Sequence, residues 1–551
     1  MNLSMFLAAS VFESKFDIIM FSIIAVVSTV LMIFVGYRLL QMLQLTGYKF
    51  KAYLKWFKET KCAYVSRLFM LAFLSFLSMI LTNVLLEDFF VGKMHIFSYI
   101  SILGYLLFCS LFIVNMFNSK QKTPLKYTKR MIRLVVVYTI IVGFATLGIE
   151  YLGFRFFPFI SFGMISIVPL LLPLVVFLAY FITWPLERLI SKSYIKKAKK
   201  KLSERQNLKV IGITGSYGKT SVKNILSTIL SSKFKICPTP ASYNTPLGLA
   251  KTILSNLRED DEIFIAEMGA KQIGDITELC DMVCPEIGII TGIGNQHFLT
   301  FGNIDNIVKT KSELAEFVSN KNGKLFINTD GALAKSVSEK FANSIAVSLE
   351  NNVFNISKIE TTKNGSTFEI SYNGKKKKCK TILLGKHNIS NIVLASTVAL
   401  ELGLTLDEIA DGIEKLHTVS HRLEIIKSSS RYMIIDNSYN SSVQGSEASL
   451  EVLSKFDGQK FVITPGLVEL GKEQFNANFE FGRAMSKVCD YVIIDSTINY
   501  DAINAGLVSE GFDKEHILRA GSLSQAVMVL NTLAQPEDVV LFENDLPDNY
   551  S

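Results

Sequence analysis

The sequence predicts an α-helical membrane domain of about five spans followed by α/β domains, the first of them a P-loop domain with a parallel sheet. Long apolar runs succeed one another before Glu187, whereas the later chain alternates short β-type runs with helix-like stretches. Between the two parts, Lys209–Leu226 (KVIGITGSYGKTSVKNIL) predicts a strand, a glycine-rich turn and a helix, the order found in phosphate-binding loops. The 551 residues are enough for roughly three or four domains.

The composition favours a membrane surface over nucleic acid as the partner of the basic residues. Hydrophobic residues make up 49% of the chain, the mean hydropathy is +0.32, and part of the net charge of +8 lies next to the apolar runs. No folded domain shows a basic face with interleaved aromatics, so we expect no nucleic acid partner. The seven cysteines are scattered, and Cys280 and Cys284 lack a second ligand pair, which argues against zinc and fits a reduced cytosolic side.

Each of the apolar segments has about the length that a helix needs to cross the hydrocarbon core. They are Ile18–Leu39, Leu68–Leu86, Ile96–Met116, Leu134–Leu152 and Phe159–Ile182. Basic residues crowd after the first, third and fifth segments, whereas the other loops hold little more than Lys93 and Arg155. The positive-inside rule therefore predicts a multi-pass protein of the cytoplasmic membrane, with the N-terminus outside and everything after Trp184 in the cytoplasm. Met1–Phe16 lacks the features of a cleavable signal peptide.

Polar residues are sparse in this predicted membrane domain. The spans hold almost no ionisable residue apart from Glu150, so we expect an anchor or a lipid-facing platform rather than a pump. Gln44–Phe57 mixes aromatics with lysines, which fits either a segment along the inner membrane surface or a solvated loop. Lys192–Arg205 predicts a basic, helical linker to the α/β part.

The glycine-rich turn and the start of the next helix supply the expected nucleotide contacts. Glycines let backbone N–H groups close around phosphate oxygens, and the helix N-terminus faces the same charge. Lys219 would reach the β- and γ-phosphates of ATP, and the Thr220 hydroxyl would bind Mg²⁺. The strict P-loop spacing fails because Ile213 stands at the first glycine position, so a plain tight turn is the alternative. The expected cofactor-binding residues are Gly215, Ser216, Tyr217, Gly218, Lys219, Thr220 and Ser221.

The loop T-G-S-Y-G-K-T-S resembles that of the Mur ligases, which use ATP to join amino acids to cell-wall precursors, and among them the MurF branch that adds D-alanyl-D-alanine. Further similar motifs run from about Val210 to about Gly482. The resemblance implies a Mur ligase central ATP-binding domain over 204–418 and a Rossmann-like α/β C-terminal domain over 419–551. They would follow a membrane domain with its basic cytosolic linker over 1–203.

The resemblance also implies two Mg²⁺ ions. Glu267 ends the predicted buried strand 261–269, where a carboxylate beside a P-loop is placed to hold Mg²⁺. His297 matches the family histidine near the second metal. Lys311 falls where Mur ligases carry a lysine modified to a carbamate, an anionic oxygen ligand; Lys309 is close by, so this assignment rests on the resemblance. The expected metal ligands are therefore Thr220, Glu267, His297 and Lys311.

Motifs on the nucleotide side follow further along the chain. Asn328 ends a predicted strand that looks like the family's adenine-side segment. Asn388 lies in G-K-H-N-I-S-N, which resembles the family's G-x-H-N-x-x-N and would contact nucleotide. His387 and Asn391 of the same motif could equally cap the helix. Between these motifs, Val353–Leu384 predicts a meander of short strands.

The C-terminal motifs resemble the family but depart from it at several positions. Arg422, in H-R-L-E, would reach the γ-phosphate when the C-terminal domain closes, although His421 replaces the usual glycine. Asp436 and Asn437 occupy the places of the two acids in D-D-S-Y-N-A-N, so the second position has lost its charge. The final strand, which the family follows with a basic K-G-S-R turn, is followed here by the acidic turn Glu543-Asn544-Asp545. We therefore expect altered recognition of the acceptor or of the amine.

The implied activity is a membrane-anchored, MurF-type amide ligase that works through an acyl phosphate. Its catalytic residues would be Lys219, His297, Lys311 and Arg422, its cofactors ATP and Mg²⁺, and its partners a cell-wall precursor, an amino acid or dipeptide, and inner-membrane lipids. Membrane spans stand where MurF ligases carry a UDP-binding domain, so we expect a lipid-linked acceptor, with a UDP-linked one left open. The alternatives are a ligase of poly-γ-glutamate type and a non-catalytic ATP-binding membrane scaffold.

Overall fold

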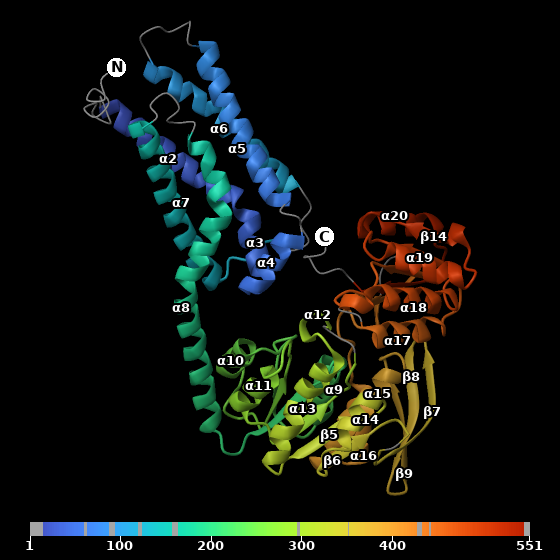
Figure 1. The fold of residues 1–551 in the computed structure, drawn as a ribbon. Helices are drawn as coiled ribbons and strands as arrows, with labels where there is room; N and C mark the ends of the chain where they lie inside the picture. The colour runs from blue at the N-terminus through green and yellow to red at the C-terminus, as the bar shows by residue number, and fades with distance from the viewer. Residues whose placement is uncertain are drawn as a thin grey trace. The chain divides into compact units, whose positions relative to one another are not determined.

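The computed structural model describes residues 15–59, 63–86, 94–118, 124–156, 164–294, 298–350, 352–426, 432–439 and 442–544. The chain divides into two compact units, Met1–Ile190 with Pro547–Ser551 and Ser191–Leu546. The described part of the first unit is helical, whereas the second unit holds the described sheets (Figure 1). The predicted domain limits at 203/204 and 418/419 remain predictions.

The first unit is built from helices. They are α2 (Lys15–Val35), α3 (Tyr37–Leu45), α4 (Phe50–Glu59), α5 (Ala63–Leu86), α6 (Met94–Asn118), α7 (Lys129–Phe156) and the first part of α8 (Val168–Ser203). Among the described residues, four helices are long and apolar enough to cross a membrane, within Phe21–Leu45, Tyr64–Thr82, Lys129–Gly153 and Met164–Ser203. The expected span Ile96–Met116 falls in α6, of which Ile102–Asn118 counts as a shorter apolar helix, so the number of five spans remains a prediction.

Apolar side chains cover the outward faces of these helices. Phe144 on α7 is 74% exposed and Leu174 on α8 is 65% exposed, whereas polar groups turn inward. The Ser28 and Tyr105 hydroxyls lie 2.7 Å apart, and the Tyr138 hydroxyl donates to the Met32 carbonyl at 2.8 Å. This inside-out polarity is what a hydrocarbon solvent favours.

Polar and basic residues gather where α3 ends and α7 begins. Arg133 donates from Nε and Nη2 to the two carboxylate oxygens of Glu187 on α8. The Gln44 side chain bonds both the N–H and the carbonyl of Lys126. The segment Gln44–Phe57 is therefore not a simple solvated loop: most of it belongs to α3 and α4, and Phe50 and Tyr53 pack against α8.

The second unit begins with a six-stranded parallel sheet of order β2-β3-β1-β4-β5-β6. Its elements are β1 (Lys209–Thr214), α9 (Lys219–Leu230), β2 (Ile236–Pro238), α10 (Pro246–Ser255), β3 (Ile263–Glu267), α11 (Asp275–Val283), β4 (Ile287–Ile290), α12 (Phe298–Phe301), α13 (Ile304–Asn320), β5 (Lys324–Asn328), α14 (Ala332–Ser338) and β6 (Ser344–Val347). The apolar run of β1 is buried because it lies between β3 and β4. The parallel sheet and P-loop expected from the sequence are confirmed.

The basic linker before β1 is helical and anchored within this unit. Lys201 in the last turn of α8 donates to the carbonyls of Ile253 and Leu257, at 2.8 and 2.6 Å. Arg205 donates to the carbonyls of Arg258 and Asp261. A cation at these carbonyls also complements the C-terminal end of α10.

A three-stranded antiparallel sheet and two helices follow. They are β7 (Asn355–Thr362), β8 (Gly365–Tyr372), β9 (Lys375–Thr381), α15 (Lys386–Glu401) and α16 (Leu406–Glu414). The predicted meander is confirmed, and its last hairpin turns at Asn373-Gly374, where both residues have positive φ. The G-K-H-N motif lies at the N-terminus of α15.

The last sheet has the order β10-β11-β15-β12-β13-β14, with only β10 antiparallel among its described strands. Its elements are β10 (Glu424–Ile426), β11 (Met433–Asn437), α17 (Val443–Leu453), β12 (Lys460–Thr464), α18 (Gln474–Ser486), β13 (Tyr491–Ile494), α19 (Tyr500–Ser509), β14 (Ile517–Arg519), α20 (Leu523–Leu533) and β15 (Val539–Glu543). The mostly parallel sheet, with helices between its strands, agrees with the expected α/β architecture, although its strand order differs from the 3-2-1-4-5-6 of a Rossmann fold. Ligands of such sheets bind at the carboxyl ends of the strands.

Candidate active site

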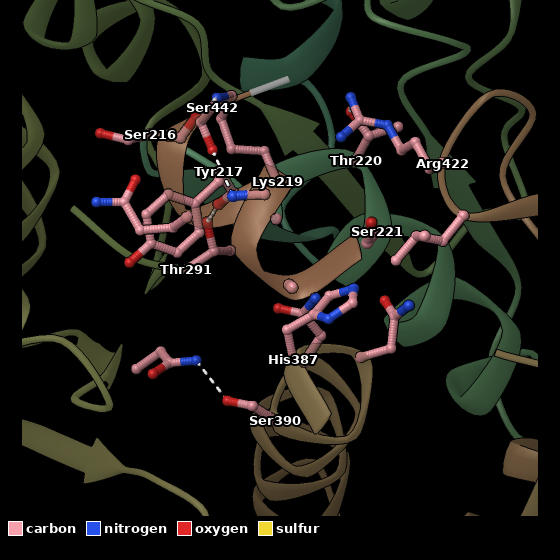
Figure 2. A pocket seen from close by; sticks show the side chains of 18 of the residues that line it. Ser216, Tyr217, Lys219, Thr220, Ser221, Thr291, His387, Ser390, Arg422 and Ser442 are labelled. Carbon is pink, nitrogen blue, oxygen red and sulfur yellow. Dashed lines mark hydrogen bonds between the residues drawn. The ribbon is translucent and has the colours of Figure 1, made fainter. Parts of the chain in front are cut away.

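The glycine-rich loop joins the buried end of β1 to the N-terminus of α9. Gly218 has φ +79°, a left-handed conformation that glycine adopts without strain. Lys219 folds back over the loop, donating from Nζ to the carbonyls of Gly215 at 2.8 Å and Ser216 at 3.2 Å (Figure 2). Burial lowers the pKa of Lys219 to about 8, while the nearby Glu267 carboxylate opposes that shift. A phosphate would give this ammonium a stronger partner than two carbonyls.

Glu267 lies at the centre of a buried polar cluster beside the loop. Its Oε1 accepts from the Thr220 hydroxyl and from the Asn244 amide, each at 3.2 Å. Its Oε2 accepts from Lys223 Nζ at 3.0 Å, and both side chains are 1% exposed. Lys223 also donates to the carbonyl of Ala241. The predicted pair Thr220 and Glu267 is thus brought together, and Lys223 and Asn244 complete the cluster.

Burial distinguishes the two candidate lysines on α13. Lys309 is exposed, whereas Lys311 is 4% exposed. Burial, assisted by the positive charge of Lys219, lowers the pKa of Lys311 to about 7. Lys311 is therefore the one that can be a neutral amine near physiological pH. His297 lies outside the described residues, so its predicted place near a second metal remains a prediction.

The nucleotide-side motifs meet at the N-terminus of α15. The Asn328 amide donates to the Ser390 hydroxyl at 2.8 Å, and that hydroxyl donates to Asp330. The Asn388 amide donates to the Leu384 carbonyl at 2.8 Å, so this group is engaged with local backbone. Burial lowers the pKa of His387 to about 4, which keeps its ring neutral. Figure 2 shows His387 and Ser390 on the same helix below the loop.

Arg422 reaches the P-loop helix from the C-terminal sheet's side of the site. Its Nη2 donates to the Thr220 hydroxyl at 3.4 Å, and its guanidinium lies 5.0 Å from the centre of the Tyr439 ring (Figure 2). His421 has φ +64°, and its Nδ1 lies 2.7 Å from Asp436 Oδ2. His421 therefore adopts a left-handed conformation, which is uncommon for a residue other than glycine, with the help of that hydrogen bond.

These residues surround a cavity of about 430 Å³. The predicted residues that line it are Ser216, Tyr217, Gly218, Lys219, Thr220, Ser221, Glu267, Asn328, Asn388, Arg422 and Asn437. Gly215, Lys311 and Asp436 do not belong to its lining. Asp436 instead accepts from His421 and from the Ser438 N–H, on the side of β11 opposite to Asn437.

The cluster around Glu267 fits one Mg²⁺ ion. The Thr220 hydroxyl and Glu267 Oε1 are oxygen donors that already lie within 3.2 Å of each other, and Mg²⁺ prefers such hard ligands. No group of three or more His, Cys, Asp or Glu side chains is gathered for a metal among the residues that the structure describes. A nucleotide phosphate would have to complete the coordination, as it does in P-loop sites.

Sequence reasoning missed several polar residues of the site. The Thr291 hydroxyl donates to the Tyr217 carbonyl and so holds the loop from β4's end. Asn244, Lys223 and Ser390 were not singled out as site residues. The spacing of Thr220 and Lys223, three residues apart on one helix, was the one available signal for Lys223.

The comparisons agree with the geometry. The family model of the Mur ligase middle domain matches residues 213–399. UDP-N-acetylmuramoyl-tripeptide–D-alanyl-D-alanine ligase of Bacillus subtilis is 26% identical over 341 residues, which is 61% of this chain and 72% of the relative. The Escherichia coli protein of that name is also 26% identical, over 50% of this chain and 62% of its own length. The chain thus spans less than two thirds of some of these relatives.

Solved structures point the same way. MurF ligase from Thermotoga maritima, in complex with ADP, superposes with a TM-score of 0.58 and 26% identity over 64% of this chain and 80% of that one. MurF from Acinetobacter baumannii shares the fold, with a TM-score of 0.58. Residues 213–399 therefore match a Mur ligase middle domain, and the homologues of this chain are ATP-dependent carbon–nitrogen ligases of the Mur ligase family. Within that family it is similar to MurF, with an additional N-terminal helical region.

Replacing Lys223 by Met leaves the buried Glu267 carboxylate without its cation. We expect Lys223→Met to lower the free energy of unfolding by about 3–5 kcal/mol, the usual cost of removing one partner of a buried ion pair. The melting temperature of the purified chain in detergent would report this loss. Lys235→Met, which breaks the exposed ion pair with Asp260, is the matched control and should change little. Equal melting temperatures for both variants would contradict a charged, paired Glu267.

Proposed function

We propose that this chain is a membrane-anchored, ATP-dependent ligase that joins the carboxylate of a cell-wall peptide precursor to the amine of an amino acid or dipeptide. One observation carries the proposal: Arg422 meets Thr220 of the phosphate-binding helix at the rim of one nucleotide-sized cavity. Both α/β parts of the second unit thus contribute polar side chains to the same space. The MurF relatives, whose name specifies a tripeptide precursor and D-alanyl-D-alanine, support this substrate class.

The proposed reaction has two steps. The acceptor carboxylate attacks the γ-phosphorus of ATP, the bond to the bridging oxygen breaks, and ADP leaves from an acyl phosphate. The amine then attacks the acyl carbon, inorganic phosphate leaves, and the nitrogen loses a proton to give the amide. Lys219 and Arg422 stabilise the negative charge on the phosphate oxygens. Closure of the C-terminal α/β part, which presents Arg422, over the cavity would exclude the water that hydrolyses an acyl phosphate.

The residues proposed to hold Mg²⁺ are those that the sequence predicts. Thr220 and Glu267 would hold the first ion, and His297 with a carbamate on Lys311 the second. The ions would offset the charge of the phosphates. A neutral Lys311 amine adds to CO₂ to form the N-carboxylate and releases one proton, which converts the neutral amine into an anionic oxygen ligand. The burial of Lys311 and its lowered pKa favour the neutral amine that this step requires.

The principal test is product formation by the full-length protein. We expect ADP release only when Mg²⁺-ATP, a precursor carboxylate and an amine are all present, with a new amide bond detected by mass spectrometry. Lys219→Met should lower this turnover ~100-fold or more because the transition state loses a charged donor. Nucleotide binding without turnover under any substrate mixture would contradict the proposal and favour an ATP-binding scaffold. Turnover with glutamate polymers alone would favour the poly-γ-glutamate alternative.

Removing CO₂ should test the modification of Lys311. We expect turnover to fall in CO₂-free buffer and to recover on addition of bicarbonate. Because the pKa is about 7, recovery should be strong at about pH 8, where the amine is neutral, and weak at about pH 6, where the ammonium dominates. Lys311→Arg, which keeps a cation but forms no stable carbamate, should lose both turnover and the bicarbonate response. If turnover of the chain with its natural sequence does not depend on CO₂, the proposed carbamate on Lys311 is contradicted.

The membrane placement is part of the proposal. The outward apolar faces of α7 and α8 support contact with lipid, and Arg130, Arg133 and the exposed lysines of α4 lie near the junction of α3 and α7. Basic residues at one end of the first unit agree with a cytoplasmic side there. A ligase held at the bilayer suits an acceptor that carries a lipid. A UDP-linked acceptor, as named for the MurF relatives, would need no such anchor.

Cys284 offers a test of the topology in intact cells. It is exposed, whereas the other described cysteines are buried. If the ligase part is cytoplasmic, a membrane-impermeant maleimide should label the chain at Cys284 only after the cells are permeabilised. Cys284→Ser should remove that signal and serves as the control. Labelling at Cys284 in intact cells would contradict the predicted topology.

A further inference from the structure

The Arg422 loop is held by a pair of side chains, Asn437 and Glu543, both of which lie in motifs where the sequence departs from the resemblance described above. Asn437 and Glu543 are partners in the register of the parallel strands β11 and β15, at the carboxyl end of both. The Asn437 amide donates from Nδ2 to both Glu543 oxygens, at 3.1 and 2.9 Å. The sequence motifs suggested two separate departures, an amide in place of an acid and an acidic turn in place of a basic one. In the structure, the two residues concerned, Asn437 and Glu543, form one hydrogen-bonded contact.

Glu543 is bound from a second side as well. Its side chain is fully buried, and its Oε2 accepts from the Ser449 hydroxyl on α17 at 2.6 Å. The first turn of α17 lines the cavity through Gln444 and Gly445. Among the described residues, Asn437 and Ser449 both donate to this carboxylate, and a buried carboxylate resists displacement because losing a hydrogen-bond donor in a low dielectric is costly. Glu543 therefore fixes β11, β15 and α17 to one another.

Asn437 links Glu543 to the loop that contains Arg422. Its Oδ1 accepts from the Leu423 N–H at 3.3 Å, and Leu423 has φ +48°, a left-handed conformation that a branched apolar residue adopts only under constraint. The next residue back is Arg422, which donates to Thr220. The Asn437 carboxamide therefore donates from its NH₂ group to Glu543 and accepts with its oxygen from the Leu423 N–H. A carboxylate at 437 could accept but could not donate, and it would place two negative charges side by side.

We propose that Asn437 and Glu543 form a matched pair that positions Arg422 for the terminal phosphate of the nucleotide, and that the uncharged amide at 437 is the condition for a buried acid at 543. Both are positioning residues that act through the Arg422 loop. The part that concerns the phosphate rests on the proposed function. The part that concerns the pair rests on the hydrogen bonds alone.

An exchange of donor and acceptor tests the pair without changing its shape. Asn437→Asp puts two carboxylates in contact, and we expect a lower melting temperature of the full-length chain. We also expect ~10-fold weaker ATP binding with a smaller effect on ADP, because Arg422 would act on the terminal phosphate. The double variant Asn437→Asp/Glu543→Gln restores the network with reversed polarity: the new amide on β15 would donate to the new carboxylate on β11 and accept from Ser449. Both measurements should return close to those of the unmodified chain.

Asn437→Ala and Asn437→Ala/Glu543→Gln are the controls. Alanine at 437 carries no charge, so adding Glu543→Gln relieves no repulsion between carboxylates. We expect no rescue in that background. If Asn437→Asp fails to fold, the double variant with Glu543→Gln must fold. A double variant no better than Asn437→Asp, or equal rescue of the alanine variant, would overturn the pair. A chain that binds neither ATP nor ADP would contradict the proposed function instead, and the melting temperatures would still decide on the pair.

Discussion

The buried carboxylate of Glu267 is the constraint on which the site depends. The register between β1 and β3 places Ile213 opposite Glu267, so the strand that enters the phosphate loop brings the carboxylate beside it. A charge that is 1% exposed has to be compensated, and Thr220 and Lys223 do this from one face of α9. The rotation of α9 about its axis is thereby fixed. Lys219 starts the same helix, so the position of its ammonium, which we propose to bind phosphate, also depends on the contact between α9 and Glu267.

Arg422 depends on a second, independent constraint. The residues on either side of it have positive φ, +64° at His421 and +48° at Leu423, and such conformations persist only where neighbouring contacts determine them. His421 is held by Asp436 and Leu423 by Asn437, from opposite faces of β11. The arginine is thus presented by a rigid turn rather than by a mobile loop. This explains how the chain holds a histidine in a left-handed conformation at a position where the resemblance implies a glycine.

Much of this could be read from the sequence, and the failures have physical reasons. The strand, loop and helix around Gly215–Thr220 were predictable because local periodicity and glycine chemistry determine them. Lys309 and Lys311 could not be separated, since two residues on a helix differ by about 200° in direction and only packing decides which one is buried. Asp436 and Asn437 were assigned together from the motif, although strand alternation allows only one of them to face the cavity. Lys223 was overlooked, and Asn244, although it lies in a segment that resembles a family motif, was given no site role, because both act through a tertiary contact with Glu267.

The network at the end of β15 bears on how an acceptor could be recognised. The resemblance places a basic turn there, suited to a phosphate or a carboxylate, whereas Glu543 here is acidic, buried and already bound by Asn437 and Ser449. Asn544 is engaged too, donating to the Gly466 carbonyl at 2.7 Å. The described donors Asn437 and Ser449 are thus engaged with Glu543, so this edge would lack the affinity that a basic turn would supply to a precursor anion. Confinement of enzyme and acceptor to one bilayer raises their effective concentration without any new contact. A membrane anchor and an acidic turn are therefore consistent with each other, because the anchor would reduce the need for the binding energy that the turn no longer provides.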